Sequence, residues 1–266
     1  MNFLSKRRRH AAARPLVLFA ALLMVGLGYS VVSPQQTSAD SDMSQQVEEG
    51  KALFNVTCSS CHGLNGEGTS EGPSLIGVGS ASVNFQVATG RMPAARPEAQ
   101  IPARTPIYSD EQVDALAAYI STWGAGVDIP TESQYSPEGL SAEEIARGGS
   151  LFRANCSACH GIVGGGGALP DGKYAPSLLK SANIHIWEAM RTGPQQMPVF
   201  SKDVITDSDA REIIGYLNEA HAQPTFGGLG MGENGPVSEG FWVFILGIGG
   251  IAVVATWITK KGARAR

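Results

Sequence analysis

The chain contains two Cys-x-x-Cys-His frames, and these use every cysteine in the sequence. The frames are Cys58-Ser59-Ser60-Cys61-His62 and Cys156-Ser157-Ala158-Cys159-His160. Two thiols at this spacing reach the two vinyl groups on one edge of a porphyrin, and the imidazole that follows can ligate the iron from below. The frames therefore predict two covalently bound haems c. The attachment points are Cys58 and Cys61 for the first haem and Cys156 and Cys159 for the second, and the proximal iron ligands are His62 and His160.

Two other uses of paired cysteines fit less well. A structural zinc site would bring two Cys-x-x-Cys pairs together, but 94 residues separate Cys61 from Cys156, against roughly 15 to 20 in zinc ribbons. A redox dithiol belongs to a strand-helix context, and a histidine directly after both pairs would then be a coincidence. No cysteine remains for a disulfide elsewhere.

The sixth iron ligand is expected to be methionine. Met92 and Met197 occupy equivalent places after the two frames, and each precedes a proline that favours an extended conformation for the residue before it. Met190 is a weaker candidate because it falls in an amphipathic stretch, where methionine is usually packed in a core. His185 could compete, although a lone histidine among apolar neighbours is more often a packed residue. Sulfur opposite imidazole raises the reduction potential and leaves no open iron position, so we expect electron carriers and no catalytic residue.

An internal repeat places these groups in two similar units. Shifting the chain by 98 residues superposes the stretch from Gly50 to Phe54 on that from Gly148 to Phe152, and then the two frames. Each unit is expected to open with a helix before its first cysteine and to close with an amphipathic helix. The closing helices are expected to begin at Ser109 or Asp110 and at Thr206 or Asp207, and to bury Leu116, Tyr119 and Ile120, or Ile213, Tyr216 and Leu217.

The predicted fold is therefore all-α, with two tandem domains and two apolar helices outside them. The predicted domains cover residues 44–126 and 141–224, and residues 127–140 form the linker between them. A glycine-rich tether is expected at 225–240, followed by a transmembrane helix at 241–259 and a basic tail at 260–266. At the other end, residues 1–40 form a basic N-terminus with an apolar helix at 16–32, which is either a cleaved signal or a retained anchor.

The flanks of the apolar helices predict the topology. Residues 241–259 are uncharged, long enough to cross a hydrocarbon core of about 30 Å, and carry Trp242 and Trp257 near their ends. The basic residues after this helix and before the first one are expected to stay in the cytoplasm. Both domains would then lie on the outer face of a bacterial cell membrane.

Charge is divided between the tails and the body of the chain. The first 14 residues hold five basic groups and the last seven hold four, which leaves 11 basic residues against all 24 acidic ones between them. Such an acidic body would repel nucleic acid. It could attract a basic protein surface, or it could simply be a solvated surface.

Each unit resembles a class I c-type cytochrome domain, because it combines Cys-x-x-Cys-His-Gly, a Pro-Ser-Leu segment and a Met-Pro loop. This resemblance implies that the carbonyl groups of Pro73 and Pro176 accept hydrogen bonds from His62 and His160. The whole arrangement resembles the dihaem cytochrome c subunits of actinobacterial cytochrome bc complexes. That family implies cytochrome b and Rieske iron-sulfur subunits as partners. It also implies electron transfer from quinol, through the Rieske centre and both haems, to a terminal oxidase.

Three other functions are compatible with some of these features. The chain could be the electron-accepting dihaem subunit of a membrane dehydrogenase, whose haem frames would look the same. It could be a subunit of a haem-copper oxidase, although similar chains there generally place their membrane helix before both haem domains. A dihaem peroxidase needs an open or labile iron position, and Met92 and Met197 argue against it.

Overall fold

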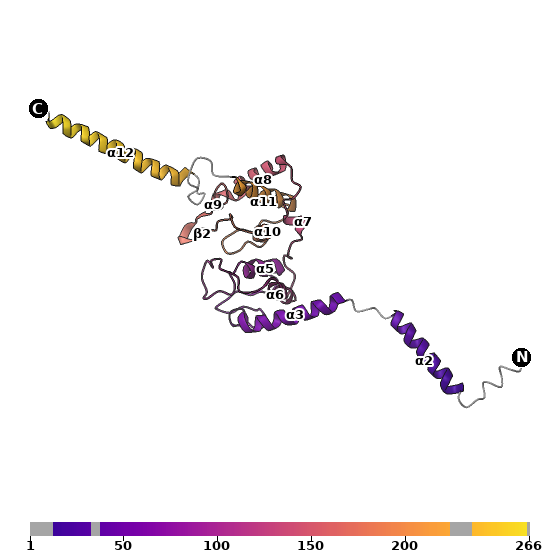
Figure 1. The fold of residues 1–266 in the computed structure, drawn as a ribbon. Coiled ribbons are helices and arrows are strands. Elements are labelled where there is room, and N and C mark those ends of the chain that lie inside the picture. Colours follow the sequence, from indigo (N-terminus) through magenta and orange to yellow (C-terminus); the bar gives the residue numbers. More distant parts are fainter. Residues whose placement is uncertain (1–12, 33–37, 224–235, 265–266) are drawn as a thin grey trace. The chain divides into compact units, whose positions relative to one another are not determined.

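The computed structural model describes residues 13–32, 38–223 and 236–264 (Figure 1). The predicted basic N-terminus before residue 13, most of the predicted tether at 225–240 and the last two residues lie outside this described part. The described chain is mostly helical, which confirms the predicted fold class. A two-residue antiparallel pair, β1 (Gly167–Ala168) and β2 (Tyr174–Ala175), lies in the loop of the second repeat and was not predicted.

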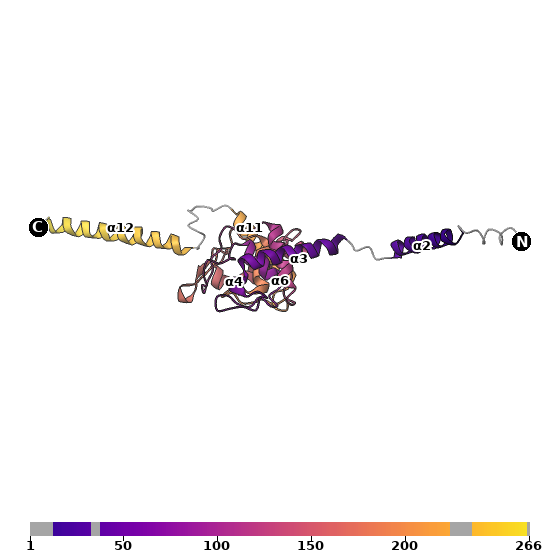
Figure 2. The same cartoon turned by 90° about the horizontal axis from the view of Figure 1, so that it is seen from below.

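The first repeat forms α3 (Ser38–Thr57), α4 (Ser59–His62), α5 (Ser80–Ala88) and α6 (Asp110–Ser121). From residue 46 onward α3 lies across α6, as Figures 1 and 2 both show. Phe54 of α3 is fully buried, and its ring centroid lies 5.7 Å from that of Tyr119 and 5.0 Å from that of Trp123. Aromatic rings at these distances and tilts pack favourably beyond the area they bury. The helix before the first frame is thereby fixed on the closing helix.

The second repeat has the same plan with more elements. Its helices are α8 (Ala142–Asn155), α9 (Ser157–His160), α10 (Asn183–Thr192) and α11 (Asp207–Ala222), and a short 3-10 helix, η1 (Pro170–Gly172), separates β1 from β2. Phe152 of α8 is the counterpart of Phe54 and is also buried, against the half-buried Tyr216 of α11 at 5.7 Å between ring centroids. The two cores are thus built around equivalent helix pairs.

Both closing helices begin with a capping box. Ser109 caps α6 and Thr206 caps α11, because each side-chain oxygen accepts a hydrogen bond from the backbone three residues later. Each capping hydroxyl thus belongs to the first of the two residues proposed from the sequence. Acidic side chains in the first turn of each helix complement the helix dipole.

The two repeats pack on each other through α5 and α10, with the short linker helix α7 (Glu132–Tyr135) against α10 and α11 (Figure 1). The ring of Phe85 on α5 meets the imidazole of His185 on α10 edge to face, with 6.1 Å between centroids. The amide of Asn84, oriented with its nitrogen toward α10, donates to both carboxylate oxygens of Glu188 at 3.1 and 3.3 Å. The repeats therefore share a specific contact.

Two apolar helices complete the described chain. In α12 (Pro236–Arg264), the stretch Gly240–Lys261 is long and apolar enough to span a membrane, and none of it is buried in protein. Among the described residues it is the one stretch that meets this length. The apolar stretch Arg14–Tyr29 of α2 (Ala13–Val32) is shorter. The long C-terminal helix and the shorter N-terminal helix are both as predicted.

Candidate haem sites

Each Cys-x-x-Cys-His frame forms one tight helical turn directly after a helix that carries a buried phenylalanine. The amide of Cys58 donates to the Phe54 carbonyl at 2.9 Å, and the amide of His62 donates to the Cys58 carbonyl at 3.0 Å. The second frame repeats both bonds, from Cys156 to Phe152 at 2.8 Å and from His160 to Cys156 at 2.9 Å. The buried phenylalanine in each core therefore fixes the turn that presents the thiols and the imidazole.

A proline carbonyl orients the imidazole in both repeats. The Nδ1 atom of His62 lies 2.8 Å from the Pro73 carbonyl oxygen, and that of His160 lies 3.0 Å from the Pro176 carbonyl oxygen. Since a carbonyl can only accept, Nδ1 must carry the proton in this contact, which leaves the lone pair of Nε2 for a metal. Both histidines are thus held in the tautomer that an iron ligand needs.

The loop that brings each proline under its histidine depends on glycine. Gly68 and Gly166 occupy equivalent positions with φ of +87° and +92°, a region that side-chain-bearing residues rarely adopt. Their amides donate to the carbonyls of His62 at 2.7 Å and of His160 at 2.8 Å. A Cβ at Gly68 would lie 2.6 Å from the amide nitrogen of Ser74. Each loop therefore closes tightly over its histidine.

In the first repeat the expected donor atoms surround one cavity. This cavity has a volume of about 330 Å³, and its lining includes Cys58, Cys61, His62 and Met92. Two thiols, an imidazole and a thioether around one space are the groups that attach and ligate a haem c. The residues of the first site therefore fit this cofactor.

In the second repeat the two candidate methionines differ in burial. Met197 is half-buried and packs against the same cluster as Cys156. Met190 is 3% exposed and belongs to the interior of that cluster on α10. This agrees with the packing role that the sequence suggested for Met190.

His185 belongs to the contact between the repeats. Its Nδ1 atom lies 2.9 Å from Oε2 of Glu188, and its ring lies against Phe85. Burial raises the pKa of the Glu188 carboxyl, and the bond to His185 opposes this effect. The histidine considered as a rival ligand is therefore engaged by a carboxylate and by the other repeat.

Burial shapes the ionisation of the groups in the frames. It raises the pKa of the Cys58 thiol, and it raises the pKa of Cys156 to about 11. Burial also lowers the pKa of His160, against the opposing effect of its bond to Pro176. The neutral imidazole that metals bind is thereby favoured at His160.

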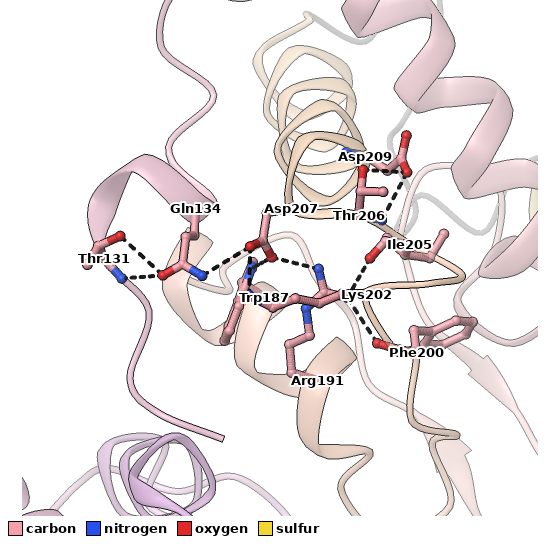
Figure 3. A network of polar contacts seen from close by, with 10 residues as sticks. All are labelled: Thr131, Gln134, Trp187, Arg191, Phe200, Lys202, Ile205, Thr206, Asp207 and Asp209. Carbon is pink, nitrogen blue, oxygen red and sulfur yellow. Dashed lines mark hydrogen bonds and ion pairs between the residues drawn. The ribbon is translucent and has the colours of Figure 1, made fainter. Parts of the chain in front are cut away.

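A polar network, which sequence reasoning missed, supports the loop that follows Met197 (Figure 3). The guanidinium of Arg191 donates to the carbonyls of Phe200 at 2.9 Å and Ile205 at 2.6 Å, and to the carboxylate of Asp207 at 2.8 Å. Arg191 is only 5% exposed. Its position one helical turn after Trp187, on the buried face of an amphipathic stretch, was the available signal.

Asp207 is the centre of this network. Burial by itself would raise the pKa of Asp207, but four hydrogen-bond donors outweigh burial and hold this pKa well below its ordinary range. These donors are Lys202, Arg191, Gln134 and Trp187. The equivalent residue in the first repeat is Asp110, and Ala88 stands where the second repeat has Arg191. The two sites therefore differ in how the loop after the methionine is supported.

Comparison with known proteins agrees with this architecture. Residues 47–123 match the family described as cytochrome c, and residues 143–217 match the family described as subunit III of cbb3-type cytochrome c oxidase. The cytochrome c subunit of the cytochrome bc1 complex from Corynebacterium diphtheriae is 40% identical, over 96% of each chain. The same subunit from Mycobacterium leprae is 43% identical over 94% of this chain and 87% of its own length. A thiosulfate dehydrogenase from Allochromatium vinosum is 26% identical over 82% of this chain and 88% of its own.

Proposed function

Because this chain belongs to the family of cytochrome c subunits of the cytochrome bc1 complex, we propose that it binds two haems c and carries electrons from the Rieske centre to a terminal oxidase. The observation that carries this proposal is the duplicated site. The same helical turn, the same bond from histidine Nδ1 to a proline carbonyl and an equivalent methionine occur twice in one chain.

The proposed ligand sets assign one role to each group. Cys58 and Cys61 would hold the first haem through thioethers, with His62 and Met92 as its iron ligands. The second haem would be held in the same way by Cys156, Cys159, His160 and Met197. When bound, haem c supplies a one-electron couple, and a thioether opposite imidazole raises its potential.

The chain's own residues orient and shield this couple. Pro73 and Pro176 fix the two imidazoles, and the buried cores exclude water from one side of each frame. With histidine and methionine as ligands, neither iron would have a position left for oxygen or substrate. We therefore expect no bond-making chemistry in this subunit, which contributes to a quinol–cytochrome c reductase as an electron carrier.

Membership in this family supports the proposal that the chain works in a membrane complex with cytochrome b and Rieske partners. We propose that α12 anchors it, with the basic C-terminus in the cytoplasm and both haem domains outside. By analogy with the family, the first domain would face the oxidase and the second the Rieske protein. The acidic body of the chain suits a basic docking surface on one of these partners.

One observation favours a second candidate function. The similarity to a thiosulfate dehydrogenase extends over most of both chains, at lower identity. As a subunit of a dehydrogenase, this chain would carry electrons on haems attached at the same two Cys-x-x-Cys-His frames.

A spectrum of the assembly isolated through this chain distinguishes the two functions. The full chain would be purified with its partners in mild detergent, and a reduced-minus-oxidised spectrum recorded. Haem b signals together with haem c support the quinol reductase, and additional haem a would place the oxidase in the same assembly. Haem c alone would contradict the proposal and favour the dehydrogenase.

A further inference from the structure

The first repeat has an extended loop between its methionine and its closing helix. Seventeen residues separate Met92 from α6, whereas nine separate Met197 from α11. Within this longer connection lie residues 96–101, here called the bridging loop, in which Gln100 and Ile101 form hydrogen bonds with the second repeat. Loops usually run over the surface of a protein. The hydrogen bonds that this loop makes to the second repeat therefore require an explanation.

Gln100 of the bridging loop extends the small sheet of the second repeat. Its side-chain nitrogen donates to the carbonyl of Tyr174 at 2.5 Å, and its side-chain oxygen accepts from the amide of Tyr174 at 3.0 Å. Tyr174 pairs with Ala168 on its other side, so the amide of Gln100 occupies the open edge of β2. Two residues further on, the carbonyl of Pro176 lies 3.0 Å from Nδ1 of His160. Gln100 therefore fixes the segment that orients the proximal histidine of the second site.

Ile101, the next residue, holds the opposite side of the same site. Its carbonyl accepts a hydrogen bond from Nε2 of Gln195 at 2.9 Å. Gln195 precedes Met197 by two residues and has φ of +59°, a left-handed conformation that is unfavourable for a residue with a side chain. Such a conformation persists where surrounding contacts hold it. The bond to Ile101 is one such contact on the segment that carries Met197.

The bridging loop also borders the first site. Pro97, Glu98 and Ile101 line the same cavity as His62 and Met92. Next to Met92, the guanidinium of Arg91 lies 4.6 Å from the centroid of the Phe85 ring, whose edge-on partner is His185 of α10. The bridging loop thus borders the first site and is hydrogen-bonded to two segments of the second, the one that carries Pro176 and the one that carries Met197.

We propose that the bridging loop is the element through which the first domain positions the second haem site, with Gln100 and Gln195 as positioning residues. This inference rests on the proposed function, because it concerns the ligation of the second haem. Through this loop, the first domain holds together the segment that carries Pro176 and the segment that carries Met197. The two sites are kept in one fixed arrangement for electron transfer between them.

The test uses the full haem-loaded chain in mild detergent, with the variants Gln100→Ala and Gln195→Ala. The matched control is Gln196→Ala, because Gln196 is the exposed neighbour of Gln195. Hydrogen exchange reports on the bridging contact itself. In Gln100→Ala, exchange of the peptide that contains Tyr174 is expected to accelerate roughly tenfold, since two hydrogen bonds are lost.

A redox titration and an electron paramagnetic resonance spectrum report on the haems. Both alanine variants are expected to shift the reduction potential of the second haem and to alter its low-spin ferric signal. The other haem and the Gln196→Ala control should remain unchanged. The variant Gln100→Glu keeps the oxygen that accepts from Tyr174 and loses the donor, so it should restore part of the exchange protection.

Two results would overturn the inference alone. Unchanged hydrogen exchange in Gln100→Ala would mean that the bridging contact contributes nothing. Faster exchange with two unchanged haem signals and potentials would mean that the contact only stabilises the fold. A wild-type chain that carries no covalent haem would instead overturn the proposed function, and this inference with it.

Discussion

Gly148 of α8 lies directly against the backbone carbonyl of Glu212 on α11, so closely that a Cβ at this position would overlap the oxygen. Gly50 of α3 has the same relationship to the carbonyl of Ala115 on α6. These crossings hold the helix that precedes each haem frame against the closing helix of its domain. They are the structural reason why the two glycines occur at equivalent places in the repeat.

Replacing Gly148 with alanine should destabilise the second domain. The added methyl group must push two backbones apart, because its nearest neighbours are main-chain atoms, and overpacking of this kind costs about 1–3 kcal/mol or more. Thermal unfolding followed by circular dichroism would measure the loss. Gly240→Ala is the control, since a Cβ at Gly240 meets no atom within 4 Å. Equal unfolding temperatures for both variants would refute the close crossing.

Removing either proposed methionine ligand should affect one haem only. Met92→Ala and Met197→Ala should each lower one reduction potential and create one high-spin iron that binds carbon monoxide, because the thioether that favours ferrous iron is lost. A redox titration with optical detection measures both effects. Met190→Leu is the matched control, since Met190 lies in the core and leucine preserves its volume. Two unchanged low-spin signals in Met92→Ala or Met197→Ala would exclude that methionine as a ligand.

Loss of an attachment cysteine should leave the corresponding haem on one thioether. Cys58→Ala or Cys156→Ala should shift the haem c absorption band of one haem, or remove that haem, while the other stays normal. The haem content per chain and the absorption spectrum of the denatured protein measure the number of thioether bonds that remain. Ser157→Ala, inside the second frame, tests whether any side-chain loss in the turn has the same effect. Normal haem spectra in either cysteine variant would contradict covalent attachment at that frame.

Asp207 should make the free energy of unfolding of the second domain depend on pH in the acidic range. Its pKa is lowered in the folded protein, so its stabilising contribution is complete above the ordinary aspartate pKa of about 3.9. That contribution is lost as the pH falls through the lower folded value. In Asp207→Asn the buried guanidinium of Arg191 loses its charged partner, which we expect to cost about 3 kcal/mol at neutral pH.

Unfolding measured from pH 7 down to pH 3 tests this expectation. The difference in stability between wild type and Asp207→Asn should become smaller toward the acidic end. A difference that stays constant over this range would show that the charge of Asp207 does not stabilise the domain. Asp171→Asn, at an exposed position in the same domain, is the control.

Local patterns predicted the fold because its main determinants are local. The frames, the amphipathic closing helices and the capping residues Ser109 and Thr206 each act within a few residues, and the long apolar helix is visible from composition alone. The contact between each histidine and its proline carbonyl came only from the family resemblance. It joins residues 11 or 16 positions apart through loops without a periodic pattern.

Long-range contacts were invisible for a different reason. Gln100 and Tyr174 are 74 residues apart, and Gln195 and Ile101 are 94 apart. A glutamine in a loop is usually solvated, so neither glutamine carried a signal in the sequence. The pair β1 and β2 was missed because strands of two residues in a glycine-rich loop show no alternation.

Quinol-driven reduction of the isolated complex tests the central claim most directly. The full chain would be purified with its partners in mild detergent, oxidised, and mixed anaerobically with a short-chain quinol while haem b and haem c are followed optically. We predict that two equivalents of haem c per chain become reduced together with haem b. Reduction of haem b while haem c stays oxidised would contradict a role for this chain in carrying electrons out of the complex.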